Sequence, residues 1–217
     1  MYKAVLTLLV LAAPALVNAQ GNRAGSWEWS FAGIYQDSSS SGGSGGSSLS
    51  VDSELGLGFG FNYNFNNRFA LGADLEWLRP DYTAVIVLDE VPPQTETISH
   101  NLSQFNGRIK GTWNMMEGPL TPYLEAGFGW TYVDSNVADG PPQTGCWWHP
   151  WWGYICSNFW DTYDSTEFSY GGALGLRYIM RGGMMVKLSV NHYELDTGGD
   201  RTNPTLNAAR LEIGWTF

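Results

Sequence analysis

The feature that most constrains the fold is an alternation of side chains with a period of two residues. From residue 55 to residue 63, leucine, phenylalanine and tyrosine at odd positions alternate with glycine and asparagine at even positions. Successive side chains of a β-strand point to opposite faces, so this segment predicts a strand with one apolar face and one small or polar face.

Seven further segments alternate in the same way. Their length is close to the roughly 10 residues that a tilted strand needs to cross a membrane. We therefore predict an all-β fold, a membrane-spanning antiparallel up-and-down β-barrel of about eight strands whose apolar face contacts lipid. The apolar faces of these segments consist of Trp27, Trp29, Phe31 and Tyr35; Phe69, Leu71, Leu75 and Trp77; Phe105, Ile109 and Trp113; Leu124, Ala126, Phe128, Trp130 and Tyr132; Phe168, Tyr170, Leu174, Leu176 and Tyr178; Val186, Leu188 and Val190; and Leu211, Ile213, Trp215 and Phe217.

The connections between these segments alternate in length. Long ones cover residues 38–50, 79–102, 133–167 and 195–205, and short turns such as 64–68 and 181–183 lie between them. Long extracellular loops over short periplasmic turns are typical of membrane barrels, whereas a soluble lipocalin-like barrel is the alternative. We expect the hairpin within residues 79–102 to continue beyond the membrane. The Ser/Gly run from residue 38 to residue 48 is expected to be a flexible exposed loop.

The N-terminus predicts export. Lys3 precedes an apolar stretch over residues 4–15, and Val17-Asn18-Ala19 has the small-residue pattern of a cleavage site. We expect residues 1–19 to be a signal peptide cleaved near Ala19, and residues 20–217 to form one outer-membrane β-barrel domain.

Composition supports this class. The chain has 27 Gly, 11 Trp and 15% charged residues, against about 25% charged in soluble domains. Membrane barrels place Trp and Tyr in two interfacial girdles. Removal of residues 1–19 takes away one base, so the mature chain has 10 bases, 21 acids and a charge of −11, which disfavours a nucleic-acid partner.

Together with these features, the C-terminal sequence Leu211-Glu-Ile-Gly-Trp-Thr-Phe217 resembles the outer membrane protein β-barrel domain family, the small OmpA-, OmpX- and OmpW-like barrels. The resemblance implies a place in the cell outer membrane and contact with its lipid and lipopolysaccharide. It also implies that the outer-membrane assembly machinery reads Trp215 and Phe217 as a C-terminal signal. It implies no activity, because adhesins, channels, lipid enzymes and structural tethers share this fold.

The inward face of the strands carries charges of both signs. They either form a network of ion pairs that fills the lumen or line an ion path. We favour the network, because the interior of an eight-stranded barrel just holds its side chains and unpaired charges there would be costly. Two pairs are expected, Asp74 with Arg108 and Lys110 with Glu125. The charged residues are Glu28, Glu54, Asp74, Glu76, Arg108, Lys110, Glu125, Arg177, Lys187, Arg210 and Glu212.

The chain's two cysteines, Cys146 and Cys156, bracket four tryptophans in the third long loop. In an oxidising envelope they predict a disulfide. One intervening histidine, His149, supplies too few ligands for a metal site. The aromatic cluster could dock on the outer leaflet, cap the barrel or bind a sugar or a protein.

Three functions remain in view. We favour a non-catalytic, monomeric envelope protein, without a cofactor, whose loops serve surface interaction or envelope integrity. A narrow passive channel is the alternative, since inward glycines such as Gly58, Gly127 and Gly171 could leave room. A lipid A-modifying enzyme is the third. Lipid A deacylases carry His and Ser two residues apart on a strand, but here Glu194 stands where that serine would follow His192, so the nucleophile is missing.

Overall fold

The computed structural model describes residues 23–42, 46–88, 94–138, 143–149, 151, 153–159, 162–196 and 203–217. The expected signal peptide and its cleavage site lie outside these residues and stay predictions. Within the described ranges, no helix is long and apolar enough to cross a membrane.

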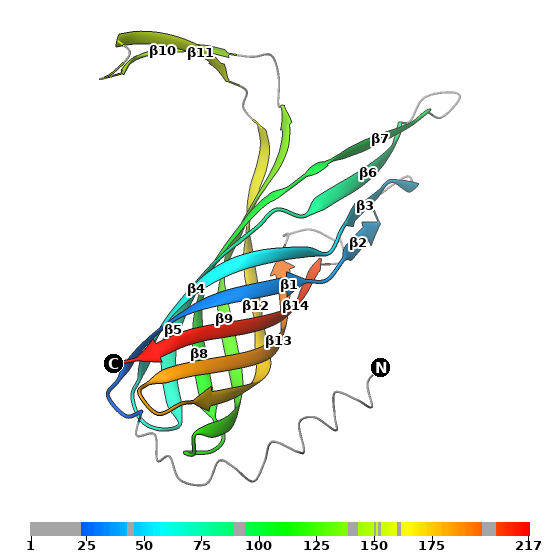
Figure 1. Cartoon of the computed structure of the whole chain (residues 1–217). Helices are drawn as coiled ribbons and strands as arrows, with labels where there is room; N and C mark the ends of the chain where they lie inside the picture. The colour runs from blue at the N-terminus through cyan, green and yellow to red at the C-terminus, as the bar shows by residue number, and fades with distance from the viewer. Residues whose placement is uncertain are drawn as a thin grey trace.

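Eight of the described strands close into a barrel, and each pairs antiparallel with its neighbours in the order β1-β14-β13-β12-β9-β8-β5-β4 (Figure 1). Each alternating segment of the sequence is one of these strands, so the predicted fold class is confirmed. Gly182 and Gly183 both have positive φ in the tight turn between β12 and β13, a conformation that favours glycine. The barrel strands are β1 (Trp27–Gln36), β4 (Glu54–Asn64), β5 (Phe69–Leu78), β8 (Ser103–Asn114), β9 (Leu120–Ala138), β12 (Thr162–Ile179), β13 (Met184–Asp196) and β14 (Thr205–Thr216).

The side chains alternate between the lumen and the outer surface as the period of two requires. In β4, Leu55 and Leu57 are each 73% exposed, while Gly56 and Asn62 face inward and are buried. The apolar face therefore points outward, toward lipid, which rules out the lipocalin-like alternative. A small apolar cluster, formed by Ala32, Ile34 and Leu78, is an exception that lies inside the barrel.

A second sheet extends the barrel at the end with the long connections. It has the order β2-β3-β6-β7 and consists of β2 (Ser39–Gly42), β3 (Ser48–Val51), β6 (Asp81–Leu88) and β7 (Gln94–Asn101). The β6-β7 hairpin thus continues beyond the barrel as expected. The prediction of a flexible loop for residues 38–48 is wrong for Ser39–Gly42 and for Ser48. Ser48 in β3 lies opposite Val85 of β6, and Ser39–Gly42 pairs with β3 in turn. Residues 43–45 lie outside the described part of the chain.

The third long connection carries a separate hairpin of β10 (Gln143–His149) and β11 (Gly153–Phe159), drawn well beyond the ends of β9 and β12 in Figure 1. Cys146 and Cys156 lie opposite each other on it and are disulfide-bonded, which confirms the predicted bridge. Trp148 lies opposite Tyr154, and both side chains are 70% exposed. The bridge therefore links the two strands of a ribbon with exposed aromatic side chains.

Candidate functional site

The barrel lumen is the most polar interior in the described part of the chain. Ten of the eleven charged residues expected to face the lumen are buried there, and Arg23 joins them. Burial of this many charges is costly unless opposite charges meet with good geometry. The buried acids are Glu28, Asp74, Glu76, Glu125 and Glu212, and the buried bases are Arg23, Arg108, Lys110, Arg177, Lys187 and Arg210.

A central layer of the lumen is built around Asp74 and Glu76 on β5. Asp74 Oδ2 lies 2.8 Å from Lys110 Nζ and 2.9 Å from Arg210 Nη1. Glu76 accepts hydrogen bonds from Arg108 at 2.7 Å and from Arg210 at 2.8 Å. Arg210 lies on β14, across the barrel interior from β5, and therefore links the two carboxylates of β5.

The two expected ion pairs have different outcomes. Lys110 Nζ lies 3.2 Å from Glu125 Oε2, so this pair is present. Asp74 and Arg108 are direct register partners, yet the expected ion pair between them is wrong. Arg108 reaches diagonally to Glu76, because long side chains lean along the strand, and Asp74 is taken up by Lys110 and Arg210.

A second layer lies nearer the short turns. Glu28 forms an ion pair with Arg177 and accepts a 2.6 Å hydrogen bond from Asn64 Nδ2. Lys187 Nζ lies 3.9 Å from a carboxylate oxygen of both Glu28 and Glu212. Since Arg210 Nε lies 3.0 Å from Glu212 Oε1, the two layers form one continuous network.

Two residues differ from what the sequence indicates. Glu54, expected in the network, is only half-buried at the start of β4 and makes no ion pair within the described residues, because the outer rim opposite it is filled by a Gln36–Gln104 amide pair. Arg23 was missed. It precedes β1, outside every alternating segment, yet its buried guanidinium donates to the Met116 carbonyl at 2.8 Å. Burial lowers the pKa of Arg23 to about 10, so it remains charged at neutral pH.

Neighbouring side chains occupy the space beside some of the inward glycines. A Cβ at Gly60 would lie 2.8 Å from both Asp74 Oδ1 and Ser30 Oγ, and one at Gly175 would lie 2.5 Å from Tyr123 Cζ. These two glycines therefore make room for charged and aromatic groups and leave no open path at their own positions, which weakens the case for a channel.

The remaining residues singled out in the sequence lie outside the lumen. Trp215 is the penultimate residue of β14, with its ring centroid 4.8 Å from that of Trp29, and Phe217 exchanges backbone hydrogen bonds with Trp27. His192 faces outward on β13, as the alternation predicts, with Nδ1 2.7 Å from Asn207 Oδ1. Among the described residues, no group of three His, Cys, Asp or Glu side chains could hold a metal ion.

The two ends of the barrel differ in charge. The connections at the end with the second sheet, residues 37–53, 79–102, 139–161 and 197–204, carry nine acids and two bases. The short connections at the other end, residues 65–68, 115–119 and 180–183, carry one acid and two bases. The negative charge of the chain is therefore concentrated at the end with the long connections, while the lumen is nearly balanced.

Solved structures with the same fold are outer-membrane barrels. OprG from Pseudomonas aeruginosa is 16% identical, with a TM-score of 0.55 over 92% of this chain and 99% of that chain. Neisserial surface protein A is 12% identical, with a TM-score of 0.50 over 88% of this chain and 97% of that chain. Ail from Yersinia pestis, in complex with the heparin analogue sucrose octasulfate, is 13% identical, with a TM-score of 0.50 over 89% of this chain and 99% of that chain. At these identities the likeness establishes the fold alone.

No curated protein matches the chain. The model of one family, described as the outer membrane protein beta-barrel domain, matches residues 4–217. The described residues form a closed barrel of eight antiparallel strands between Trp27 and Thr216, and the chain belongs to this family of outer-membrane proteins.

Proposed function

We propose that the protein is a non-catalytic barrel of the outer membrane whose closed lumen anchors extracellular strands for surface contact or envelope integrity. The observation that carries this proposal is the continuous ion-pair network from Glu28 to Glu125, which occupies the lumen that a channel would need open. The proposal includes signal-peptide cleavage near Ala19, assembly through Trp215 and Phe217, contact with lipopolysaccharide, and a monomeric state.

The outer surface supports a non-catalytic role. His192 is the histidine that a lipid-modifying reaction would use, and within the described residues its side chain contacts Asn207 and Glu194. Neither an amide nor a carboxylate beside it supplies the hydroxyl or thiol nucleophile of an acyl-transfer enzyme. The second sheet and the disulfide-linked hairpin, by contrast, extend from the barrel and suit contact with a partner.

The wild-type protein is expected to show no steady conductance in a planar lipid bilayer. Arg108→Ala removes the side chain that packs 4.0 Å over the Tyr193 ring and pairs with Glu76, so it should create a conducting state. Arg68→Ala is the control, because Arg68 pairs with Glu117 on the exposed short turns, outside the lumen. Steady conductance of the wild type would contradict the closed lumen and favour the passive channel.

The acidic outer connections predict the charge of a contact partner. The protein in nanodiscs should bind a basic peptide such as oligolysine, and the affinity should fall as salt rises, because exposed charges are screened. Sucrose octasulfate, the ligand in the Ail complex, should not bind to this chain. Replacing the exposed acids Asp52, Asp81 and Glu96 by their amides should weaken peptide binding. Tighter binding of the octasulfate than of the peptide would overturn this part of the proposal.

A further inference from the structure

The β10–β11 hairpin belongs to the only stretch of the outer connections that combines many aromatic residues with no charge. From residue 140 to residue 160 the sequence contains no Asp, Glu, Lys or Arg, but it contains five of the chain's 11 tryptophans. Seven of the nine acids at this end of the barrel lie on the other three long connections. An uncharged aromatic segment can be buried against a partner without removing a charge from water, so it indicates a contact site.

The exposed aromatic side chains gather at the tip of the hairpin. Trp148 and Tyr154 lie opposite each other, and Trp151, in the turn between the two strands, is 83% exposed. Cys146 and Cys156 form the next pair on the same face, two residues further from the turn. The disulfide therefore holds the strands together directly below the aromatic tip, which lowers the entropy that a contact would cost.

The polar residues of the hairpin are separate from this tip. Thr144 pairs with Asn158 and Gly145 with Ser157, both nearer the barrel than the disulfide, and an aromatic residue returns only at Phe159. Sites for a sugar or a specific protein surround their aromatic anchors with polar groups that fix the orientation of the ligand. Trp and Tyr gathered at one end of a segment, without charges, are typical of the interface of a lipid bilayer.

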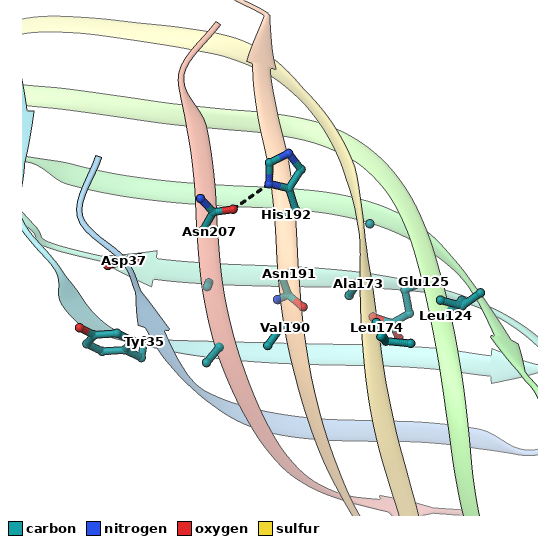
Figure 2. Close-up of a pocket in the computed structure, with 13 residues that line it drawn as sticks. Tyr35, Asp37, Leu124, Glu125, Ala173, Leu174, Val190, Asn191, His192 and Asn207 are labelled. Atoms are coloured by element: carbon teal, nitrogen blue, oxygen red, sulfur yellow. Dashed lines mark hydrogen bonds between the residues drawn. The ribbon is translucent and has the colours of Figure 1, made fainter. Parts of the chain in front are cut away.

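The lipid-facing wall of the barrel ends well short of the tip. On β13 and β14 the outward side chains become polar at His192 and Asn207, whose Nδ1 and Oδ1 atoms lie 2.7 Å apart (Figure 2). On β9 the outward aromatic side chains end at Tyr132, and the strand continues to Ala138, a further distance of about 20 Å along the chain. The hairpin follows that point and is drawn beyond it in Figure 1. Its tip is therefore placed to meet a surface other than the protein's own membrane.

We propose that the tip of the β10–β11 hairpin inserts into the interface of a second, zwitterionic bilayer that faces the outer membrane. The inference rests on the proposed surface-contact function and names a partner for it. Trp148, Trp151 and Tyr154 enter the headgroup region of that bilayer. An anionic bilayer is disfavoured, because the acids of the neighbouring connections repel it.

Co-sedimentation with vesicles tests this proposal. The full chain in nanodiscs is mixed with sucrose-loaded phosphatidylcholine vesicles, with empty nanodiscs as the blank, and the protein that sediments is measured. The wild type should bind, and salt should leave its affinity nearly unchanged. Trp148→Ala combined with Trp151→Ala should lower the affinity roughly tenfold or more, because both rings lose their burial in lipid. Phe65→Ala, at an exposed aromatic residue of a short turn, should bind as the wild type does.

A second pair of variants tests the need for an uncharged tip. Trp148→Glu should abolish sedimentation with the vesicles, because a carboxylate at the tip would have to leave water. Leu49→Glu adds the same charge at an exposed position of β3, outside the hairpin, and should bind nearly as the wild type does. Equal losses in the two variants would mean that net charge, and not the tip, controls binding.

Oligolysine binding to the same preparations separates this proposal from the surface-contact function on which it rests. The tip variants should keep the wild-type affinity for oligolysine, because the acids of the other connections are unchanged. The proposal fails if the wild type does not sediment with the vesicles, if phosphatidylglycerol vesicles bind more tightly, if salt weakens vesicle binding as it weakens oligolysine binding, or if the neutral sugar maltoheptaose releases the vesicles. Oligolysine binding that persists in any of these cases leaves the surface-contact function standing.

Discussion

Replacing Glu28 by glutamine should lower the free energy of unfolding of the barrel by about 3 to 5 kcal/mol, as for other buried pairs that lose one partner. Glu28 is fully buried and forms an ion pair with Arg177, while Lys187 Nζ lies 3.9 Å from Glu28 Oε2. Glutamine keeps the shape and the acceptor oxygen for Asn64 but removes the charge. Arg177 and Lys187 are then left in a lumen with one carboxylate fewer, which explains the large cost.

Urea unfolding in lipid vesicles measures this change by linear extrapolation. Glu117→Gln is the matched control, because it breaks the exposed pair with Arg68 and should cost less than about 1 kcal/mol. A double-mutant cycle of Glu28→Gln with Arg177→Met separates the coupling from other effects. A coupling near zero, or equal losses in Glu28→Gln and Glu117→Gln, would mean that the network does not stabilise the barrel.

The barrel could be predicted from the sequence because one physical rule governs each of its strands. A strand between lipid and a polar lumen must alternate, so the pattern in residues 55–63 indicates both the strand and its two faces. The rule fails at two inward positions of β1 and β5. Ile34 and Leu78 face the interior and pack with Ala32 in a small apolar cluster. Alternation alone does not reveal where a polar lumen contains such a cluster.

The lumen network could be predicted only in part. Alternation identifies which charges face inward, and the short turn indicates that Lys110 and Glu125 are neighbours. It does not show how far a guanidinium reaches. Arg210 comes from β14 and contacts Asp74 and Glu76 on β5, across the interior from β14 in the closed barrel. With Asp74 paired to Arg210, Arg108 pairs with Glu76 instead. The Arg210 contact depends on the closure of the sheet into a barrel, which the alternation pattern of single strands does not reveal.

The second sheet shows a different limit of sequence analysis. Serine and glycine have low strand propensity, so Ser39–Gly42 gives no sign of a strand. The strand forms because β3 offers it a row of unpaired backbone groups, and β3 in turn pairs with β6. Backbone hydrogen bonding to an existing edge requires no particular side chain. Partners of this kind become visible only when the neighbouring strand is in place.

Replacing Leu188 by arginine should destabilise the barrel by about 2 to 4 kcal/mol, the cost of a cation near the middle of the bilayer on the lipid face of a barrel. Leu188 faces outward near the centre of β13, between Leu176 on β12 and Leu211 on β14. Both neighbours in this row are leucines, so the new guanidinium finds no polar partner beside it. It must reach the interface or draw water into the hydrocarbon.

The matched control is Leu49→Arg, at an exposed leucine of β3 in the sheet outside the barrel. There the guanidinium stays in water, and the free energy of unfolding should change by less than about 0.5 kcal/mol. Unfolding in vesicles compares the two variants, and spin labels at Leu57 and Leu188 should report lipid tails. If Leu188→Arg were as mild as Leu49→Arg, or if both labels reported water, the outward leucines would not face lipid, and the assignment of the two faces would have to be reversed.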